Sequence, residues 1–198
     1  MLKFFFYGIL ASLGALFLEM TISVTSWDAI SINIASYQIS WALILAVLIE
    51  ESLKLLFINK YIQEIKNNKI NGSVILNSEK IFFGSILFGF GFSVLESFFF
   101  IYDPSITASA SYLNILGVIM IHAATSGYIG YFLSFEWIAG LLVSIRIIMI
   151  ASLFHFLYNL LVIYDAADHT KIIYLSVVIF FLIWLKYNRK WIEKVTDK

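Results

Sequence analysis

Residues 81–101 read IFFGSILFGFGFSVLESFFFI, an apolar run in which Glu96 is the single ionisable side chain. A helix rises about 1.5 Å per residue, so a run of roughly 20 residues can cross the ~30 Å hydrocarbon core of a bilayer. A carboxylate inside that core is costly unless it has a partner or a water-filled cavity. The run therefore predicts a membrane-spanning helix, and its glutamate indicates a functional site.

The whole chain has the same apolar character. Its 198 residues are 61% hydrophobic and 13% charged, with a mean hydropathy of +0.91, whereas soluble domains carry about a quarter charged residues. One proline and 19 phenylalanines fit helices rather than a β-barrel. We expect an all-α polytopic membrane protein, a single domain over residues 1–198 with about six transmembrane helices in one bundle. The expected spans are about residues 4–23, 32–58, 81–101, 112–135, 137–163 and 172–187.

The basic residues predict the orientation of this bundle. Ten of the 13 lysines and arginines lie near the N-terminus, in the second connection or in the C-terminal tail. Positively charged connections stay on the cytoplasmic side, so both termini should be cytoplasmic. The net charge of zero gives no indication of a nucleic-acid partner. The absence of cysteine excludes disulfides, thiolate metal sites and a cysteine nucleophile.

Polar groups lie at similar depths in four of the expected spans. Glu50, His122 and His155 each lie about ten residues from a membrane face, which is roughly 15 Å and close to the midplane. Glu96 and Asn159 lie about one helical turn nearer the outer face. We therefore expect one cluster at the midplane that opens outward.

Spacing along the helices places these groups on common faces. Lys54 follows Glu50 by four residues and Glu51 by three, so it can pair with either carboxylate. A pair of this kind is often structural, but one lysine cannot neutralise two carboxylates. His155 and Asn159 are four apart and should project together.

Two further charges lie inside the expected spans. By helical phase Arg146 faces opposite to His155, and we interpret both Arg146 and Glu19 as structural or interfacial. Glycines and serines around Glu96 and after His122 should let neighbouring helices approach closely. Small residues would thus bring the walls of the site together.

The residue types limit the chemistry of the cluster. The chain has no Gly-x-Ser-Gly elbow, no His-Glu-x-x-His pair and no aspartate well inside a span. Glutamate is left as the base that activates water. We favour Glu50 over Glu51, because Lys54 lies four residues after Glu50.

Three short motifs occur in order along the chain, with His122 on the helix between the last two. They are Glu50-Glu51-Ser52-Leu53-Lys54, Phe92-Ser93-Val94-Leu95-Glu96 and His155-Phe156-Leu157-Tyr158-Asn159. The order resembles the PrsW family of intramembrane proteases, relatives of the CAAX-prenyl and bacteriocin-processing protease superfamily. The resemblance covers about residues 50–159, with Lys54 and Phe92 as supporting positions.

The resemblance implies a multi-pass endopeptidase of the cell membrane. Its substrate would be a single-span membrane protein or peptide, cut near the outer side by glutamate-activated water. PrsW-like proteins are linked to site-1 cleavage of membrane-bound anti-sigma factors in bacteria. Glu50 and Glu51 would include the base, and His122 would help to polarise the water. His155 and Asn159 would stabilise the oxyanion, while Glu96 stands where the CAAX branch has a histidine.

The sequence gives two signals about a cofactor. Two histidines and a carboxylate match the ligand types of a catalytic zinc site, so zinc is possible, with His122, His155 and Glu96 as candidate ligands. The usual pair of ligands four residues apart is missing, however, since His155 is followed at that spacing by Asn159. A glutamate beside a lysine and a histidine can also activate water without a cation. We therefore prefer a mechanism without a metal.

Two other classes of function stay open. In a proton-coupled or cation-coupled transporter the same residues would form a relay, with polar groups continuing toward both faces. A non-catalytic immunity or binding protein of the same fold would tolerate Glu50→Gln.

Overall fold

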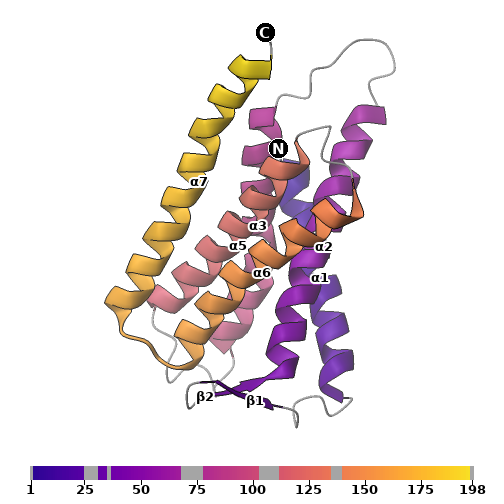
Figure 1. Cartoon of the computed structure of the whole chain (residues 1–198). Coiled ribbons are helices and arrows are strands. Elements are labelled where there is room, and N and C mark those ends of the chain that lie inside the picture. The colour runs from indigo at the N-terminus through magenta and orange to yellow at the C-terminus, as the bar shows by residue number, and fades with distance from the viewer. Residues whose placement is uncertain are drawn as a thin grey trace.

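A computed structural model describes residues 2–24, 31–34, 37–67, 78–102, 112–134 and 140–196 of the chain. Its elements are α1 (Leu2–Val24), β1 (Ser31–Ile34), β2 (Tyr37–Ser40), α2 (Trp41–Asn67), α3 (Ser78–Tyr102), α5 (Tyr112–Leu133), α6 (Leu141–Ile163) and α7 (Asp168–Thr196). The expected bundle of six long helices is confirmed. The first turn of α1 and the last turns of α7 lie at the same end of this bundle (Figure 1).

Five helices of the described chain are long and apolar enough to cross a membrane: Leu2–Thr21, Ser78–Phe98, Tyr112–Leu133, Leu141–Ile163 and Asp168–Asn188. The sixth, α2, has 27 residues but carries Glu50, Glu51 and Lys54 within its apolar part. Large apolar side chains such as Phe17 and Phe180 are exposed on the outside of the bundle, as lipid contact requires. The protein is a multi-pass membrane protein.

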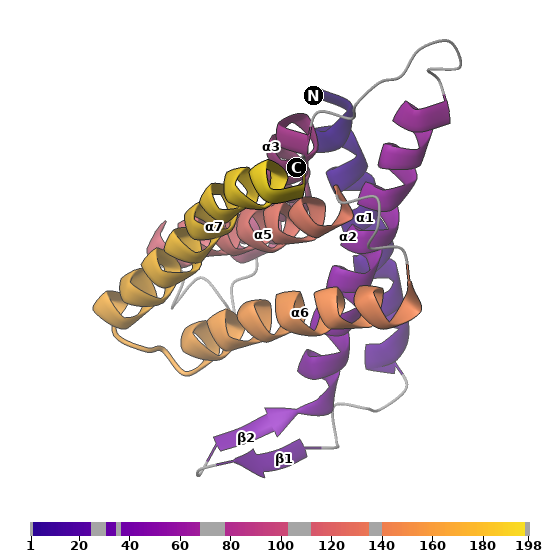
Figure 2. The same cartoon turned by 45° about the horizontal axis from the view of Figure 1, so that its top comes forward.

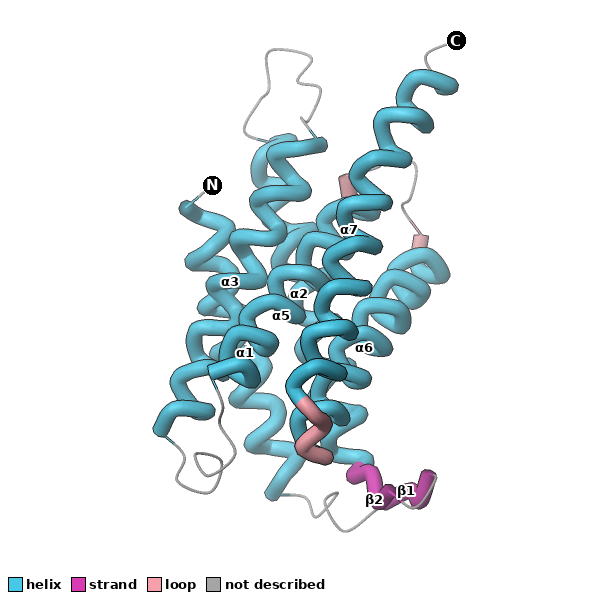
Figure 3. Tube along the Cα trace, turned by 90° about the vertical axis from the view of Figure 1, so that its left-hand side faces the viewer, coloured by secondary structure: helices cyan, strands magenta, loops and turns pink. Residues whose placement is uncertain are grey.

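The second expected span differs from the structure at its start. Residues 31–34 and 37–40 form an antiparallel hairpin in which Ser31 pairs with Ser40 and Ile34 with Tyr37, and α2 begins only at Trp41. Polar and apolar residues alternate in both strands, which is the period of a strand and not of a helix. The hairpin lies at the end of the bundle opposite the C-terminus (Figure 3).

The other expected spans match helices, with shifted ends. The last helix, α7, begins before residue 172 and continues past residue 187, because the polar residues on both sides of its apolar part are also helical. The expected spans 112–135 and 137–163 correspond to α5 and α6, and their inner limits at 135 and 137 lie outside the described residues.

Glycines bring α3 into backbone contact with the helices on both sides. A Cβ atom at Gly89 would collide with the backbone of His122 and Ala123 in α5, and one at Gly91 with the backbone of Phe5 in α1. The expectation that small residues draw the walls of the site together is confirmed here. On the other side of the site, α6 packs against α2 and α5, while α7 packs against α5 (Figure 2).

Candidate active site

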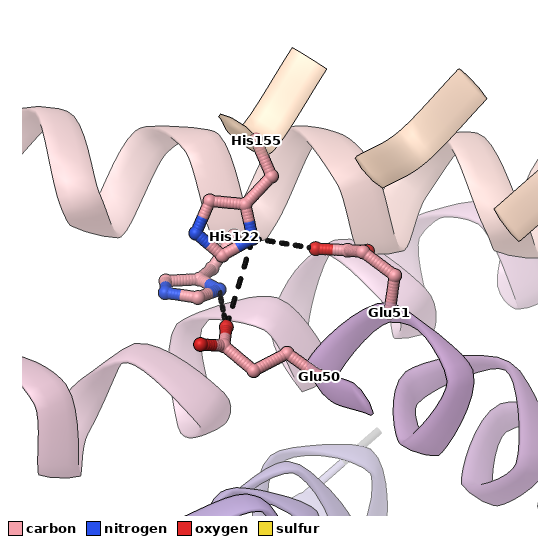
Figure 4. A group of neighbouring side chains, drawn as sticks. All are labelled: Glu50, Glu51, His122 and His155. Atoms are coloured by element: carbon pink, nitrogen blue, oxygen red, sulfur yellow. Dashed lines mark hydrogen bonds and ion pairs between the residues drawn. The ribbon is translucent and has the colours of Figure 1, made fainter. Parts of the chain in front are cut away.

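Three helices bring two glutamates and two histidines to one point inside the bundle. Glu50 and Glu51 come from α2, His122 from α5 and His155 from α6, and one nitrogen or oxygen of each lies within 4.8 Å of those of the others (Figure 4). Glu50 is 9% exposed and the other three are fully buried. We call these four residues the glutamate–histidine cluster. The structure thus brings together Glu50, His122 and His155, which the sequence analysis expected at one depth.

Lys54 neutralises part of this cluster from within α2. Its ammonium group donates to Glu51 Oε1 at 2.6 Å and to Thr125 Oγ1 at 3.1 Å. It also lies 2.8 Å from His122 Nδ1 and 4.7 Å from the centre of the Phe92 ring. Lys54 therefore pairs with the carboxylate three residues before it. The four-residue spacing to Glu50, on which our preference for that base depended, is not the pairing that forms.

The bonds of His122 fix the state of its ring. An ammonium group has only donors, so Nδ1 must accept from Lys54, and the ring proton lies on Nε2. That nitrogen donates to Glu96 Oε2, and the ring packs on Phe92 with centroids 5.0 Å apart. Glu96 and Phe92 together hold His122 in one orientation, and the Glu96 side chain is 26% exposed.

His155 completes the cluster from α6. Its Nδ1 lies 2.8 Å from Glu51 Oε1 and 3.6 Å from Glu50 Oε2. Among the residues that the structure describes, three buried polar atoms of the cluster have no hydrogen-bond partner: Glu50 Oε2, Glu51 Oε2 and His155 Nε2. Buried polar atoms are almost always bonded, so atoms left over at one point indicate a site that takes up a ligand.

The comparison with protein families agrees with this geometry. The sequence profile of the PrsW family of intramembrane metalloproteases matches residues 1–185. The chain belongs to that family. No curated protein and no solved structure matches the chain. The resemblance found on residues 50–159 is confirmed and extends over α1 and most of α7.

The donor set of this PrsW-family protein fits a divalent cation. Two imidazoles and a carboxylate are the ligands of many catalytic zinc sites, which keep a further position for water or substrate. The cluster offers these donors with the three unpartnered atoms already named. Glu96, a candidate ligand from the sequence, instead lies against the far nitrogen of His122. The fit and the family's description as metalloproteases support a bound metal over the metal-free mechanism that we preferred from the sequence.

Two further residues considered in the sequence analysis, Asn159 and Arg146, lie outside the cluster. Asn159 is half-buried one turn along α6 from His155, outside the hydrogen-bonded group that the described residues form. Arg146 is exposed, in agreement with its helical phase.

Glu19 is the residue that sequence reasoning missed. Its carboxylate interacts electrostatically with those of Glu50 and Glu96, and its Oε1 is buried without a hydrogen-bond partner among the described residues. The available signal was a carboxylate inside the first apolar run with no basic residue nearby to neutralise it.

Proposed function

We propose that this protein is an endopeptidase that cleaves a membrane-anchored protein or peptide near the outer side of the membrane. The observation that carries the proposal is the glutamate–histidine cluster, with its unpartnered acceptors inside an apolar bundle. Membership of the PrsW family supports peptide-bond hydrolysis as its chemistry. The cytoplasmic location of both termini remains the prediction from the basic residues, and it places the opening of the site on the outer side.

Access to the cluster supports the same reading. The side chains of Glu51, Lys54, His122 and His155 are fully buried, whereas that of Glu50 is 11% exposed and that of Glu96 is 26% exposed. Glu50 and Glu96 therefore mark the side from which water and a peptide reach the site. Glu50 meets both histidines there, since its Oε2 lies 3.9 Å from His122 Nδ1 and 3.6 Å from His155 Nδ1.

The residues of the cluster, together with Glu96 and Asn159, then have distinct tasks. Glu51, His122 and His155 would hold a zinc ion, which supplies Lewis acidity toward the scissile carbonyl and the attacking water. Glu50 accepts the proton of that water, because its Oε2 has no hydrogen-bond partner among the described residues and its side chain is partly exposed. It then returns the proton to the leaving amine. Glu96 keeps the His122 proton on Nε2. Asn159 supplies an amide donor to the oxyanion from one turn along α6.

The test uses purified protein in lipid nanodiscs and a panel of single-span membrane substrates. Replacing Glu50 with glutamine keeps the volume but removes the proton acceptor, so kcat/KM should fall by about 10²-fold or more. Glu79→Gln, the same change at an exposed position at the start of α3, should stay within about twofold of wild type. Cleavage by Glu50→Gln at the wild-type rate would remove Glu50 from the mechanism. Substrate binding without cleavage by the wild type would favour the non-catalytic alternative, and proton or cation flux the transporter.

The role of the metal is tested separately. The wild-type protein is stripped with a chelator, assayed, and assayed again after zinc is added back. Loss and recovery of cleavage, with one zinc per chain by elemental analysis, support the metal site. Full activity after stripping would restore the metal-free glutamate mechanism.

A further inference from the structure

We propose that the ammonium group of Lys54 is a built-in competitor of the divalent cation, so that a metal enters the site only when Lys54 withdraws from Glu51 and His122. The proposal concerns the regulation of the site described above, and it rests on the proposed function for the existence of a metal site. It makes Lys54 a positioning residue that sets metal affinity.

The first argument is that His122 has one nitrogen to offer and Lys54 already uses it. An imidazole nitrogen without a proton has a single lone pair in the plane of the ring. At His122 that nitrogen is Nδ1, which lies 2.8 Å from Lys54 Nζ, while Nε2 is bonded to Glu96. Zinc coordinates a histidine nitrogen at about 2.0–2.1 Å through the same lone pair. His122 Nδ1 can therefore serve the ammonium group or the metal, but not both.

The second argument concerns the charge at Glu51. Oxygen Oε1 of this carboxylate lies 2.6 Å from Lys54 Nζ and 2.8 Å from His155 Nδ1, so it stands between the lysine and a second candidate ligand. A dication held by Glu51 and both histidines would lie next to the ammonium group, and like charges repel strongly in a dry interior. Two of the atoms suited to the metal are thus the atoms that now hold Lys54.

The third argument is that Lys54 is held firmly in this position. All three ammonium protons have acceptors, namely Glu51 Oε1, His122 Nδ1 and Thr125 Oγ1, and the side chain is fully buried. Without a metal, the ammonium group supplies the positive charge beside the buried Glu51 carboxylate, and a buried carboxylate that loses its charged partner is costly. Lys54 thereby stabilises the empty site, and the bonds that do so must break before a cation binds.

Equilibrium zinc binding tests this proposal without any substrate. The purified full-length protein in nanodiscs is titrated with zinc against a fluorescent chelator of known affinity. Lys54→Met removes the competing charge at similar length, so zinc affinity should rise by at least about tenfold. The matched control is Lys171→Met, because Lys171 is also buried but bonds to Asn114 away from the cluster. Its zinc affinity should stay within about twofold of wild type.

A second variant separates displacement of the lysine from a general effect of charge. Thr125→Val keeps the shape and the charge of the site but removes the hydroxyl group that accepts a hydrogen bond from Lys54 at 3.1 Å and lies 3.3 Å from Glu51 Oε1. Zinc affinity should rise by roughly fivefold, the equivalent of one such bond. Zinc affinity equal to wild type in a folded Lys54→Met protein, or in Thr125→Val, would overturn the proposal. A complete absence of zinc binding in all variants would instead refute the metal site of the proposed function.

Discussion

Two lysines are buried inside this membrane protein, and their surroundings differ. Lys54 is 0% exposed and Lys171 is 1% exposed. Lys54 bonds to a buried carboxylate, an imidazole and a hydroxyl group. Lys171 donates to the neutral side chain of Asn114 at 2.9 Å, and its carboxylate neighbours Asp165 and Asp168 are 83% and 62% exposed. Burial of an ammonium group is common to both places, so it does not by itself identify a functional site.

The polar atoms left over make the distinction. Around Lys54, the cluster retains three buried atoms that lack a hydrogen-bond partner in the described part of the chain. Around Lys171, the backbone oxygen of Asn114 accepts the Tyr158 hydroxyl at 3.1 Å while its side chain accepts from the lysine. These three residues join α5, α6 and α7, and we call them the Lys171 anchor. A satisfied network stabilises the fold, whereas an unsatisfied one is ready for a ligand.

The largest expected effect comes from the same change made in both regions. Glu51→Gln removes the charge that Lys54 and His155 share, and we expect kcat/KM to fall by about 10²-fold or more. Asp168→Asn near the Lys171 anchor changes an exposed pair, and activity should stay within about twofold. The comparison is made on matched amounts of folded protein with one single-span substrate. Equal losses in the two variants would break the distinction between site and anchor.

A smaller effect should follow from replacing with alanine the glycines at which helices come into close contact near each lysine. A Cβ at Gly89 meets the backbone of His122, and one at Gly117 meets the Tyr158 hydroxyl. Overpacking costs about 1–3 kcal/mol in either place. Gly89→Ala should in addition displace His122 and reduce kcat by about tenfold. Gly117→Ala should lower the unfolding temperature while the folded fraction keeps its kcat. Thermal unfolding and kcat are measured on both variants, and a normal kcat in Gly89→Ala would show that α3 does not position the histidine.

Much of the fold could be predicted because lipid demands long apolar helices. Runs of about 20 apolar residues predict spans whatever the tertiary structure. The hairpin at residues 31–34 and 37–40 escaped prediction, because its apolar residues raise the mean hydropathy as a helix would, and only their alternation distinguishes a strand. Hydropathy measures composition, whereas the strand depends on order.

Which residues come together in the site could be predicted to a similar degree. Which hydrogen bonds and ion pairs form between them could not. The rise per residue along a helix is enough to place Glu50, His122 and His155 at one depth. The choice of Lys54 between Glu50 and Glu51 could not be predicted, since both spacings lie on one helical face. That choice depends on Thr125 and His122 of α5, which receive the ammonium group. A threonine in an apolar helix gives no signal of such a role.

The smallest expected effect concerns Glu19, because sequence alone could not show which helix it faces. Gly8 brings α1 against the backbone of α3, and in this packing the Glu19 carboxylate interacts electrostatically with Glu50 and Glu96. In Glu19→Gln an amide can donate a hydrogen bond to Glu50 and so occupy a lone pair that otherwise accepts the proton of water. We expect kcat/KM to fall by about fivefold, the equivalent of one hydrogen bond of ~1 kcal/mol. The fall should appear in kcat, measured beside Glu79→Gln as the unaffected glutamate. An unchanged kcat would place Glu19 with the Lys171 anchor as a structural charge, whereas a loss as large as that of Glu50→Gln would place it among the reacting groups.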